Sequence, residues 1–332
     1  MTERKFFVQI GKYESRVYES TSGVIPGSIL GPTTFLIFIN DIVDCVAHAM
    51  VLLFADDIKM LIQISTLDET RLLQNDINNV LEWSERNRLP FNKAKCNIIT
   101  IRRTTQFHEA TYVMGDHNIE RKEEIRDLGL LVDIKMTLVA HMEQMMTSSR
   151  QSMGYIKWIS KGQFAPKTLK VLFTAYVRSK LEFASVIWNP YAEVYRGDIE
   201  SIQKQFVMYA LGDTNRLPPY RLAPYEDRCR QLGLVTLATR RTEIDSMMAY
   251  DLYNGTISDN NIARKFIKSN QNSVLRDNRL LRESLYLNDY AYNQPIARII
   301  RKVNKFSDIM TLNRSRFKIE MKKRSSNERD DT

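Results

Sequence analysis

The sequence predicts an α+β fold, in which a mixed α/β part runs to about residue 134 and helices follow it. Two observations predict this division. Short apolar segments alternate with polar turns up to residue 134, whereas apolar residues recur at helical spacing from about residue 137 onward. With 332 residues, of which 43% are hydrophobic, the chain is long enough for one large core or several smaller ones.

The first part is predicted as a series of short elements. Alternating apolar residues predict a strand or hairpin over residues 5–20, and the apolar run of residues 35–42 predicts a helix after a loop rich in Gly and Pro. Residues 51–64 predict two short strands joined by a tight turn. A capping-box pattern at residue 66 predicts a helix from there to about residue 83, and residues 96–134 return to strand patterns.

The second part is predicted to be helical. Pro218, Pro219 and Pro224 cannot lie inside a helix, so residues 212–225 predict a linker between two helical regions. Two apolar stripes are expected on the helices before this linker, one formed by Leu169, Leu172, Phe173, Tyr176 and Val177 and the other by Ile199, Ile202, Phe206 and Ala210.

The composition indicates a basic globular chain. The 48 Lys and Arg residues against 39 Asp and Glu residues give a formal net charge of +9, which favours an anionic partner such as nucleic acid or an acidic membrane surface. A basic globular protein without such a partner is the common alternative. Residues 298–324 hold ten basic residues against two acidic ones, which can bind a phosphate backbone or simply form a solvated surface.

Cysteine usage and the apolar runs indicate the compartment. The 3 cysteines lie far apart and form no CxxC pair, which argues against a zinc module or a disulfide framework. The start of the chain is charged where a signal peptide needs an apolar core, and no apolar run has the length of a membrane span. We therefore expect an intracellular protein, in the cytoplasm or the nucleus, without a membrane segment.

Asp56 and Asp57 lie in the predicted turn between two apolar strands. Aspartate is a common turn residue, so the pair can be a plain turn. However, adjacent carboxylates repel unless a cation lies between them, and strands that are apolar on both faces are expected to be packed inside, with their turn facing a cleft. Carboxylates together with substrate phosphates are the ligands that Mg²⁺ prefers, so the pair also predicts a magnesium site.

Five blocks of the sequence resemble the reverse transcriptases of non-LTR (LINE-type) retrotransposons, in the same order along the chain. The blocks are SGVIPGS at 22–28 with LGP at 30–32 and FIND at 38–41; FADD at 54–57; Trp83, Asn87, Leu89, Asn92, Lys95 and Cys96; DLGLLVDIKMTLVAH at 127–141; and SKLEFASVIWNPY at 179–191. The FADD block resembles the aromatic-Ala-Asp-Asp hairpin of that family. The resemblance runs from about residue 20 to beyond residue 310.

The resemblance implies a partial polymerase palm, an antiparallel sheet with helices, followed by an all-α thumb and a C-terminal helical region. The implied domains are a partial palm over residues 1–126, a primer-grip hairpin and helical thumb over 127–215, and a helical region with a basic tail over 216–332. The implied activity is RNA-directed DNA synthesis, with an RNA template, a DNA primer and deoxynucleotides as partners. Mg²⁺ is the implied cofactor, with Mn²⁺ as the alternative.

The resemblance also implies roles for individual residues. Asp56 and Asp57 would hold the metal and act in catalysis, and Lys95 would neutralise or protonate the leaving group unless it is an ordinary surface lysine. Leu128, Gly129 and Leu130 would grip the primer end, unless this segment is a plain β-ribbon. The residues that would contact template or substrate are Gly23, Pro26, Gly27, Ser28, Phe54 and Ala55.

Two departures from the family pattern leave two hypotheses open. The family has a further metal-binding carboxylate in an F-x-D segment upstream, and Pro26 stands where the family has glutamine, so an amide that could contact template or nucleotide is missing. We expect either a reverse transcriptase domain that is truncated at its N-terminus and inactive alone, or a non-catalytic basic remnant that binds nucleic acid. A third outcome is a chain that misfolds because its palm sheet is left open.

Overall fold

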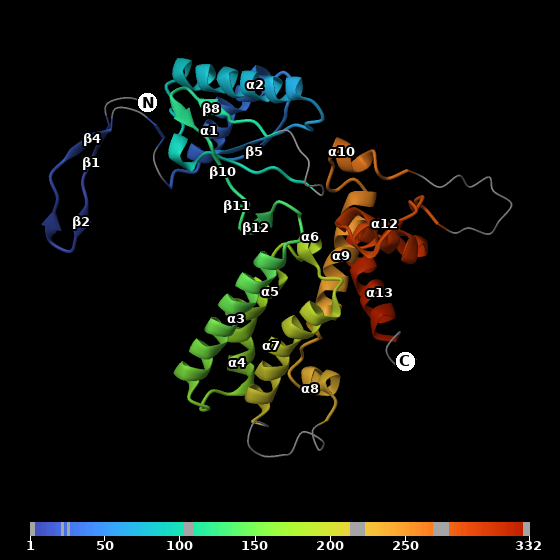
Figure 1. Cartoon of the computed structure of the whole chain (residues 1–332). Helices are drawn as coiled ribbons and strands as arrows, with labels where there is room; N and C mark the ends of the chain where they lie inside the picture. The colour runs from blue at the N-terminus through green and yellow to red at the C-terminus, as the bar shows by residue number, and fades with distance from the viewer. Residues whose placement is uncertain are drawn as a thin grey trace. The chain divides into compact units, whose positions relative to one another are not determined.

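The computed structural model describes residues 4–20, 23–24, 27–102, 109–212, 223–267 and 279–327, and Pro26 lies outside them. The described chain forms two compact units (Figure 1). The first unit holds residues up to 125 together with 133–136, and the second holds residues 126–132 and those from 137 onward. The sequence-based expectation of an α+β chain with its strands first is confirmed.

The first unit consists of short strand pairs and two helices. The expected hairpin over residues 5–20 is present as two nested antiparallel pairs, β1 (Arg4–Phe6) with β4 (Tyr18–Ser20) and β2 (Gln9–Ile10) with β3 (Tyr13–Glu14). Helix α1 (Gly31–Ile39) starts at the expected loop, has Pro32 in its first turn and continues into the 3₁₀ segment η1 (Asn40–Cys45). Strand β5 (Met50–Phe54) pairs antiparallel with β6 (Asp57–Leu61).

Helix α2 (Leu67–Arg86) follows the hairpin and begins with the predicted capping box. The Thr66 hydroxyl accepts a hydrogen bond from the Glu69 amide, and the Glu69 carboxylate accepts one from the Thr66 amide at 2.8 Å. One face of α2 supplies Val80 and Trp83 to a core cluster with Ile39 and Ile42. Ile77 on the same face joins Tyr112 and Met114 in a second cluster of the unit.

The strands after α2 are very short. They follow the 3₁₀ segment η2 (Lys93–Lys95) and comprise β7 (Asn97–Ile98), β8 (Val113–Met114), β9 (His117–Asn118), β10 (Glu120–Arg121), β11 (Glu124–Asp127) and β12 (Leu130–Asp133). A tight turn at Gly115 and Asp116 joins β8 to β9, and β10 pairs parallel with β7. In the described part of the chain the strands form six separate two-stranded sheets rather than one continuous sheet.

The second unit is helical beyond its share of the β11–β12 hairpin. Its first group of helices is α3 (Val139–Ser160), α4 (Pro166–Phe173), the π-helical segment η3 (Thr174–Arg178), α5 (Ser179–Glu182), α6 (Ser185–Trp188), α7 (Glu193–Leu211) and α8 (Tyr225–Gln231). Phe173 and Phe206 stack in its core with ring centroids 4.0 Å apart. The predicted stripe on α7 is buried, but Tyr176, expected on the other stripe, is 61% exposed because the π-helical segment shifts the helical phase.

A second group of helices completes this unit with its own core. The group is α9 (Leu237–Tyr253), α10 (Asn260–Ala263), α11 (Asp289–Tyr292), α12 (Pro295–Lys305), the 3₁₀ segment η6 (Ser307–Ile309) and α13 (Arg314–Asn327). Val303, Phe306 and Phe317 are almost fully buried in this core. None of the described helices is long and apolar enough to cross a membrane.

Candidate active site

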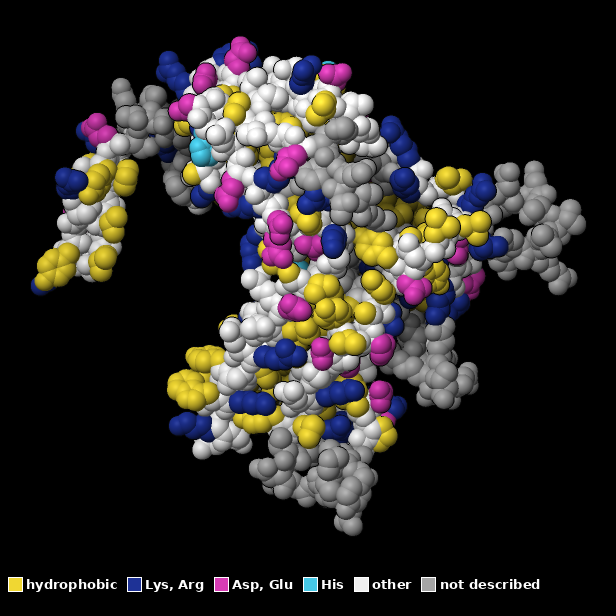
Figure 2. All heavy atoms as spheres, viewed as in Figure 1, with side chains coloured by type: hydrophobic (Ala, Val, Ile, Leu, Met, Phe, Trp, Pro, Cys, Tyr) yellow, Lys and Arg dark blue, Asp and Glu magenta, His cyan; other side chains and the backbone are white. Residues whose placement is uncertain are grey.

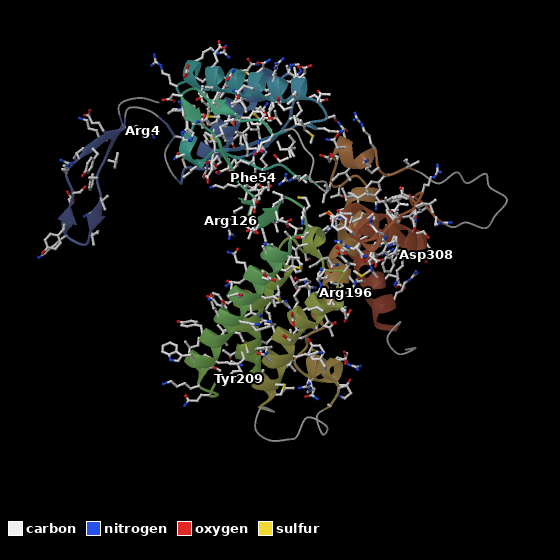
Figure 3. The ribbon with its side chains drawn as sticks, viewed as in Figure 1. Arg4, Phe54, Arg126, Arg196, Tyr209 and Asp308 are labelled. Atoms are coloured by element: carbon white, nitrogen blue, oxygen red, sulfur yellow. The ribbon has the colours of Figure 1, made fainter. Side chains whose placement is uncertain are left out.

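The two adjacent aspartates lie at the tip of the β5–β6 hairpin. The register places Phe54, labelled in Figure 3, opposite Asp57, so that Ala55 and Asp56 form a two-residue turn. Ala55 has a φ of 52°, in the left-handed region that favours glycine. Both carboxylates are exposed to solvent. The turn therefore presents two neighbouring negative charges to any cation that approaches its tip.

One face of this hairpin is exposed, and the expectation that both faces are packed inside is wrong. Leu52 and Phe54 are 44% and 62% exposed, whereas Leu53 and Ile58 pack against the core cluster of α1, η1 and α2. A hairpin of two strands that lies on helices has a single inner face, and successive side chains of a strand point to opposite faces. The apolar residues on the outer face of β5 are therefore exposed to solvent, although the apolar run in the sequence is unbroken.

Asp76 of α2 anchors the segment that leads into β5. Its carboxylate is fully buried and accepts three backbone hydrogen bonds, from the amides of Ala47 at 3.0 Å, His48 at 3.0 Å and Ala49 at 2.7 Å. Met50, the first residue of β5, follows directly. The carboxylate thus fixes the start of the strand that ends at the Asp56 turn.

The sequence reasoning did not single out Asp76, although a signal was present. Asp76 lies on the apolar stripe of α2, between Leu73 and Val80 at helical spacing, where a charged residue is costly to bury unless it is paired or hydrogen-bonded. Asp41 in the FIND block has a related role, because its carboxylate accepts a hydrogen bond from Trp83 Nε1 at 3.1 Å and so ties η1 to α2.

Four of the six residues expected to contact template or substrate precede α1 in the sequence, and the other two, Phe54 and Ala55, lie at the β5–β6 turn. Gly23 and Gly27 have φ angles of 84° and 78°, which β-carbon-bearing residues rarely adopt. Ser28 Oγ accepts a hydrogen bond from the Gly31 amide at 3.0 Å and therefore holds the first turn of α1. Pro26, the departure from the family pattern, cannot be placed among the described residues.

Lys95 lies exposed in η2, and its side chain forms no ion pair with Asp56 or Asp57, all three being described residues. Its neighbour Lys93 is engaged elsewhere, since Nζ donates to Asp116 Oδ1 at 2.7 Å. That hydrogen bond lowers the pKa of the Asp116 carboxyl. Lys95 is thus the cation of η2 that remains available to a ligand.

The donor set at the turn suits part of a metal site. Mg²⁺ in phosphate-handling sites takes one or two carboxylates together with substrate phosphates and water, and Asp56 and Asp57 supply two carboxylates at one exposed tip. Within the described ranges, no group of three or more His, Cys, Asp or Glu residues could hold a metal ion. The two carboxylates could therefore bind one cation together with the phosphates of a substrate.

The residues expected to grip the primer form the β11–β12 turn. Leu128 and Gly129 have φ angles of 45° and 90°, and Leu130 packs against the first core cluster of the second unit. A β-carbon added at Gly129 would lie 3.2 Å from Phe183 Cε1, so only glycine lets the turn approach this ring without a shift. Arg126, labelled in Figure 3, donates to Gln144 of α3 at 2.5 Å.

His141 of α3 also holds this hairpin. Its Nδ1 accepts a hydrogen bond from the Leu131 amide at 3.3 Å, and Nε2 is buried without a partner in the described residues. Burial, and then the nearby Arg126 charge, lower the pKa of His141. The neutral imidazole is therefore the form that fits this position.

The SKLEFASVIWNPY block makes structural contacts within the second unit. Lys180 donates to Ser148 Oγ and Ser152 Oγ, each at 2.8 Å, and so joins α5 to α3. Arg240 of α9 donates to both carboxylate oxygens of Glu182, at 2.9 and 3.0 Å. The polar residues of the block thus connect helices that are distant in sequence.

The basic tail is less available than its composition predicted. Arg298 is buried and pairs with Asp245 at 3.1 Å, and Arg314 pairs with Asp251 at 2.7 Å. Arg324 pairs with Asp308, labelled in Figure 3, at 2.7 Å. These arginines hold α12 and α13 in the second group of helices, so the tail is not a continuous free basic surface.

Comparisons of the sequence with known proteins point to one family. Residues 2–132 match the family model for reverse transcriptase (RNA-dependent DNA polymerase). The "RNA-directed DNA polymerase from mobile element jockey" of Drosophila melanogaster is 28% identical over 167 residues, or 48% of this chain and 18% of that protein. The protein of the same description from Drosophila funebris is 24% identical over 214 residues, covering 61% of this chain and 23% of the relative.

A third relative matches a similar share of the chain. The "Probable RNA-directed DNA polymerase from transposon X-element" of Drosophila melanogaster is 21% identical over 218 residues, covering 63% of this chain. The matched part is 18% to 24% of the length of these relatives. No solved structure matches the chain.

The chain carries a reverse transcriptase domain, as its ordered sequence blocks predicted. The three relatives are described as polymerases of a mobile element and a transposon, which supports the predicted resemblance to the non-LTR (LINE-type) retrotransposon branch. Reverse transcriptase domains in general use divalent metal ions and act on a nucleic-acid template and primer with nucleotides.

Proposed function

We propose that this chain supplies the Asp56–Asp57 metal-binding turn and the primer-contacting hairpin of an RNA-directed DNA polymerase that works inside the cell. The observation that carries the proposal is the β5–β6 hairpin, which presents two adjacent exposed carboxylates at the turn after β5, the strand whose start is held by Asp76. Residues 1–126 would form part of a palm, 127–215 a primer-grip hairpin and thumb, and 216–332 a further helical region.

Each residue of the site has a part in this proposal. Asp56 and Asp57 would hold Mg²⁺, or Mn²⁺ in its place, and the turn would fix where the phosphates of a deoxynucleotide lie. The bound metal would activate the primer hydroxyl and stabilise the pyrophosphate leaving group. Lys95 would neutralise or protonate that leaving group, and Leu128, Gly129 and Leu130 would position the primer end. Gly23, Gly27 and Ser28 would shape the loop toward the template.

The described residues do not offer a third carboxylate near the pair, so we expect the chain by itself to extend a primer poorly. The decisive assay therefore uses a hybrid in which this chain replaces the matched region of a jockey-type polymerase. We expect Mg²⁺-dependent, RNA-templated primer extension by the hybrid, reduced by about 100-fold or more in Asp56→Ala. Asp68→Ala, which removes an exposed aspartate of α2, is the matched control and should leave extension unchanged. Equal extension with and without Asp56 would refute the proposal.

The second candidate is a nucleic-acid-binding protein without catalysis. The observation that favours it is the formal net charge of +9. Binding that depends on phosphate contacts weakens steeply as salt is raised, because counterions are released. A hybrid that fails to extend a primer, together with a chain whose affinity for nucleic acid falls with salt, would favour this candidate over the polymerase.

A further inference from the structure

One segment of the second unit contains no acidic residue at all. Residues 144–181, which cover most of α3, all of α4 and η3 and the start of α5, hold no Asp or Glu. The segment's seven cations are Arg150, Lys157, Lys161, Lys167, Lys170, Arg178 and Lys180. A concentration of one sign of charge on neighbouring helices attracts an anionic partner.

Three of these cations hold the helices together, and four remain. Lys180 binds two serines of α3, Arg178 pairs with Glu182, and Lys170 donates to the Gly233 carbonyl at 2.9 Å. The other four, Arg150, Lys157, Lys161 and Lys167, have no carboxylate within ion-pair distance among the described residues. Arg150, Lys161 and Lys167 are exposed, so their charge faces solvent, whereas Lys157 is half-buried with Nζ 5.6 Å from the centroid of the Tyr209 ring.

Two large aromatic side chains lie exposed in the same segment. Tyr155 is 61% and Trp158 is 68% exposed, and their rings stack with centroids 5.8 Å apart and an interplanar angle of 30°. Met153 and Ile156 of α3 are buried in the core, so Tyr155 and Trp158 lie on the outer face of this helix. Figure 2 shows hydrophobic and basic side chains side by side on the surface over α3.

A lysine follows the aromatic pair at the end of α3. Tyr155 and Trp158 are three residues apart, which places them on one face of the helix, and Lys161 caps the C-terminal end of the helix with a left-handed backbone. Gly154 of the same helix faces open space, because a β-carbon added there would meet no heavy atom within 4 Å beyond its chain neighbours. We call Tyr155, Trp158 and Lys161 the α3 platform.

We propose that the α3 platform binds an unpaired nucleic-acid strand, whose bases stack on the aromatic pair while its phosphates contact the unpaired lysines. Exposed aromatic rings beside cations, here on a chain segment without carboxylates, are the arrangement that binds single strands without reading their sequence. The charge favours a polyanion over an ordinary protein surface. The inference rests on the proposed function, in which a polymerase would supply the single-stranded nucleic acid. The binding itself needs neither metal nor catalysis.

The tryptophan distribution makes the test direct. Of the 3 tryptophans in the chain, Trp83 and Trp188 are 1% and 3% exposed, so Trp158 is the solvent-facing fluorophore. Short oligo-dT and oligo-U strands are titrated into the full chain without Mg²⁺ or nucleotides. We expect quenching of the tryptophan fluorescence, with a Kd that weakens as salt is raised.

Variants separate stacking from general electrostatics. Measured by the anisotropy of a labelled strand, Trp158→Leu should weaken binding by about 5- to 150-fold, the loss expected for one stacked base. Tyr155→Leu should have a smaller effect in the same direction. Tyr13→Leu is the matched control, since Tyr13 is 72% exposed and Lys12 lies 5.5 Å from its ring centroid, yet it lies outside the segment.

Several results would overturn the proposal. It fails if the wild-type chain does not bind either strand, or if Trp158→Leu binds as tightly as the wild type while circular dichroism shows an unchanged fold. It also fails if the Trp158 fluorescence changes when vesicles of phosphatidylcholine and phosphatidylserine are added but not when oligonucleotides are added. The same holds if this fluorescence changes only with the concentration of the protein, which would indicate self-association. Asp56→Ala should bind strands normally, so a failure of primer extension leaves this test unaffected.

Discussion

Removal of the Asp76 carboxylate should loosen the aspartate turn from a distance. Three backbone amides donate to this carboxylate at 2.7 to 3.0 Å, and hydrogen bonds to a charged group contribute about 1.5–3 kcal/mol each. They share one acceptor group, and the amides of the exposed Ala47 and His48 can bind water once released, so their contributions do not add fully. We expect Asp76→Ala to cost the first unit about 3–4 kcal/mol, and Asp76→Asn about 2 kcal/mol because one oxygen remains.

Hydrogen exchange measured by mass spectrometry tests this reasoning at the affected residues. In Asp76→Ala the amides of residues 47–54 should exchange about 100-fold faster or more, since about 3 kcal/mol of local stability is lost. Glu82→Gln, an exposed change on the same helix, is the control and should leave this exchange unaltered. If exchange at residues 47–54 is the same in Asp76→Ala as in the wild type, Asp76 does not hold β5, and its link to the turn is refuted.

The remaining predictions concern three other positions. Burial lowers the pKa of His141 in the folded chain, so its neutral imidazole contributes its full stabilisation of the second unit at pH values above the ordinary histidine pKa of about 6.5. This contribution is lost as the pH falls below that value. Urea unfolding at several pH values should show the loss in the wild type but not in His141→Gln. Ala55→Gly should relieve about 1–2 kcal/mol of strain from the left-handed backbone, against a cost of about 0.4–1 kcal/mol in entropy of the unfolded chain. The melting temperature of the first unit should therefore rise slightly. A lower melting temperature than in the wild type would contradict the turn geometry. Phe206→Ala removes one ring of the buried stack and should destabilise the second unit by about 3–5 kcal/mol in thermal unfolding, whereas the exposed change Tyr176→Ala should cost less than about 1 kcal/mol.

The local elements of this chain were predictable from its residues. The capping box at Thr66 and Glu69, the tight turn before Asp57 and the buried stripe of α7 depend on neighbours within a few positions, so spacing alone indicates them. The ordered family blocks, the one with Asp56 and Asp57 among them, likewise identified a reverse transcriptase domain, because the motifs of a family keep their residue types at fixed spacing.

Long-range contacts were decided only by the tertiary structure. Asp76 lies 27 to 29 residues from the amides it binds, so no local pattern revealed its part in placing the turn. The outer face of β5 is exposed because only one face of the hairpin packs against helices. An apolar run in the sequence does not indicate whether one face or both faces of a strand will be covered.

Charge shows the same division between sequence and structure. The excess of basic residues in the tail and the acid-free segment 144–181 are both visible in the sequence. Folding brings Asp245, Asp251 and Asp308 against the arginines of the tail, whereas it leaves Lys161 and Lys167 without a carboxylate among the described residues. Residue counts fix the net charge of a chain, but a charge is available to a partner only if packing does not place an opposite charge beside it.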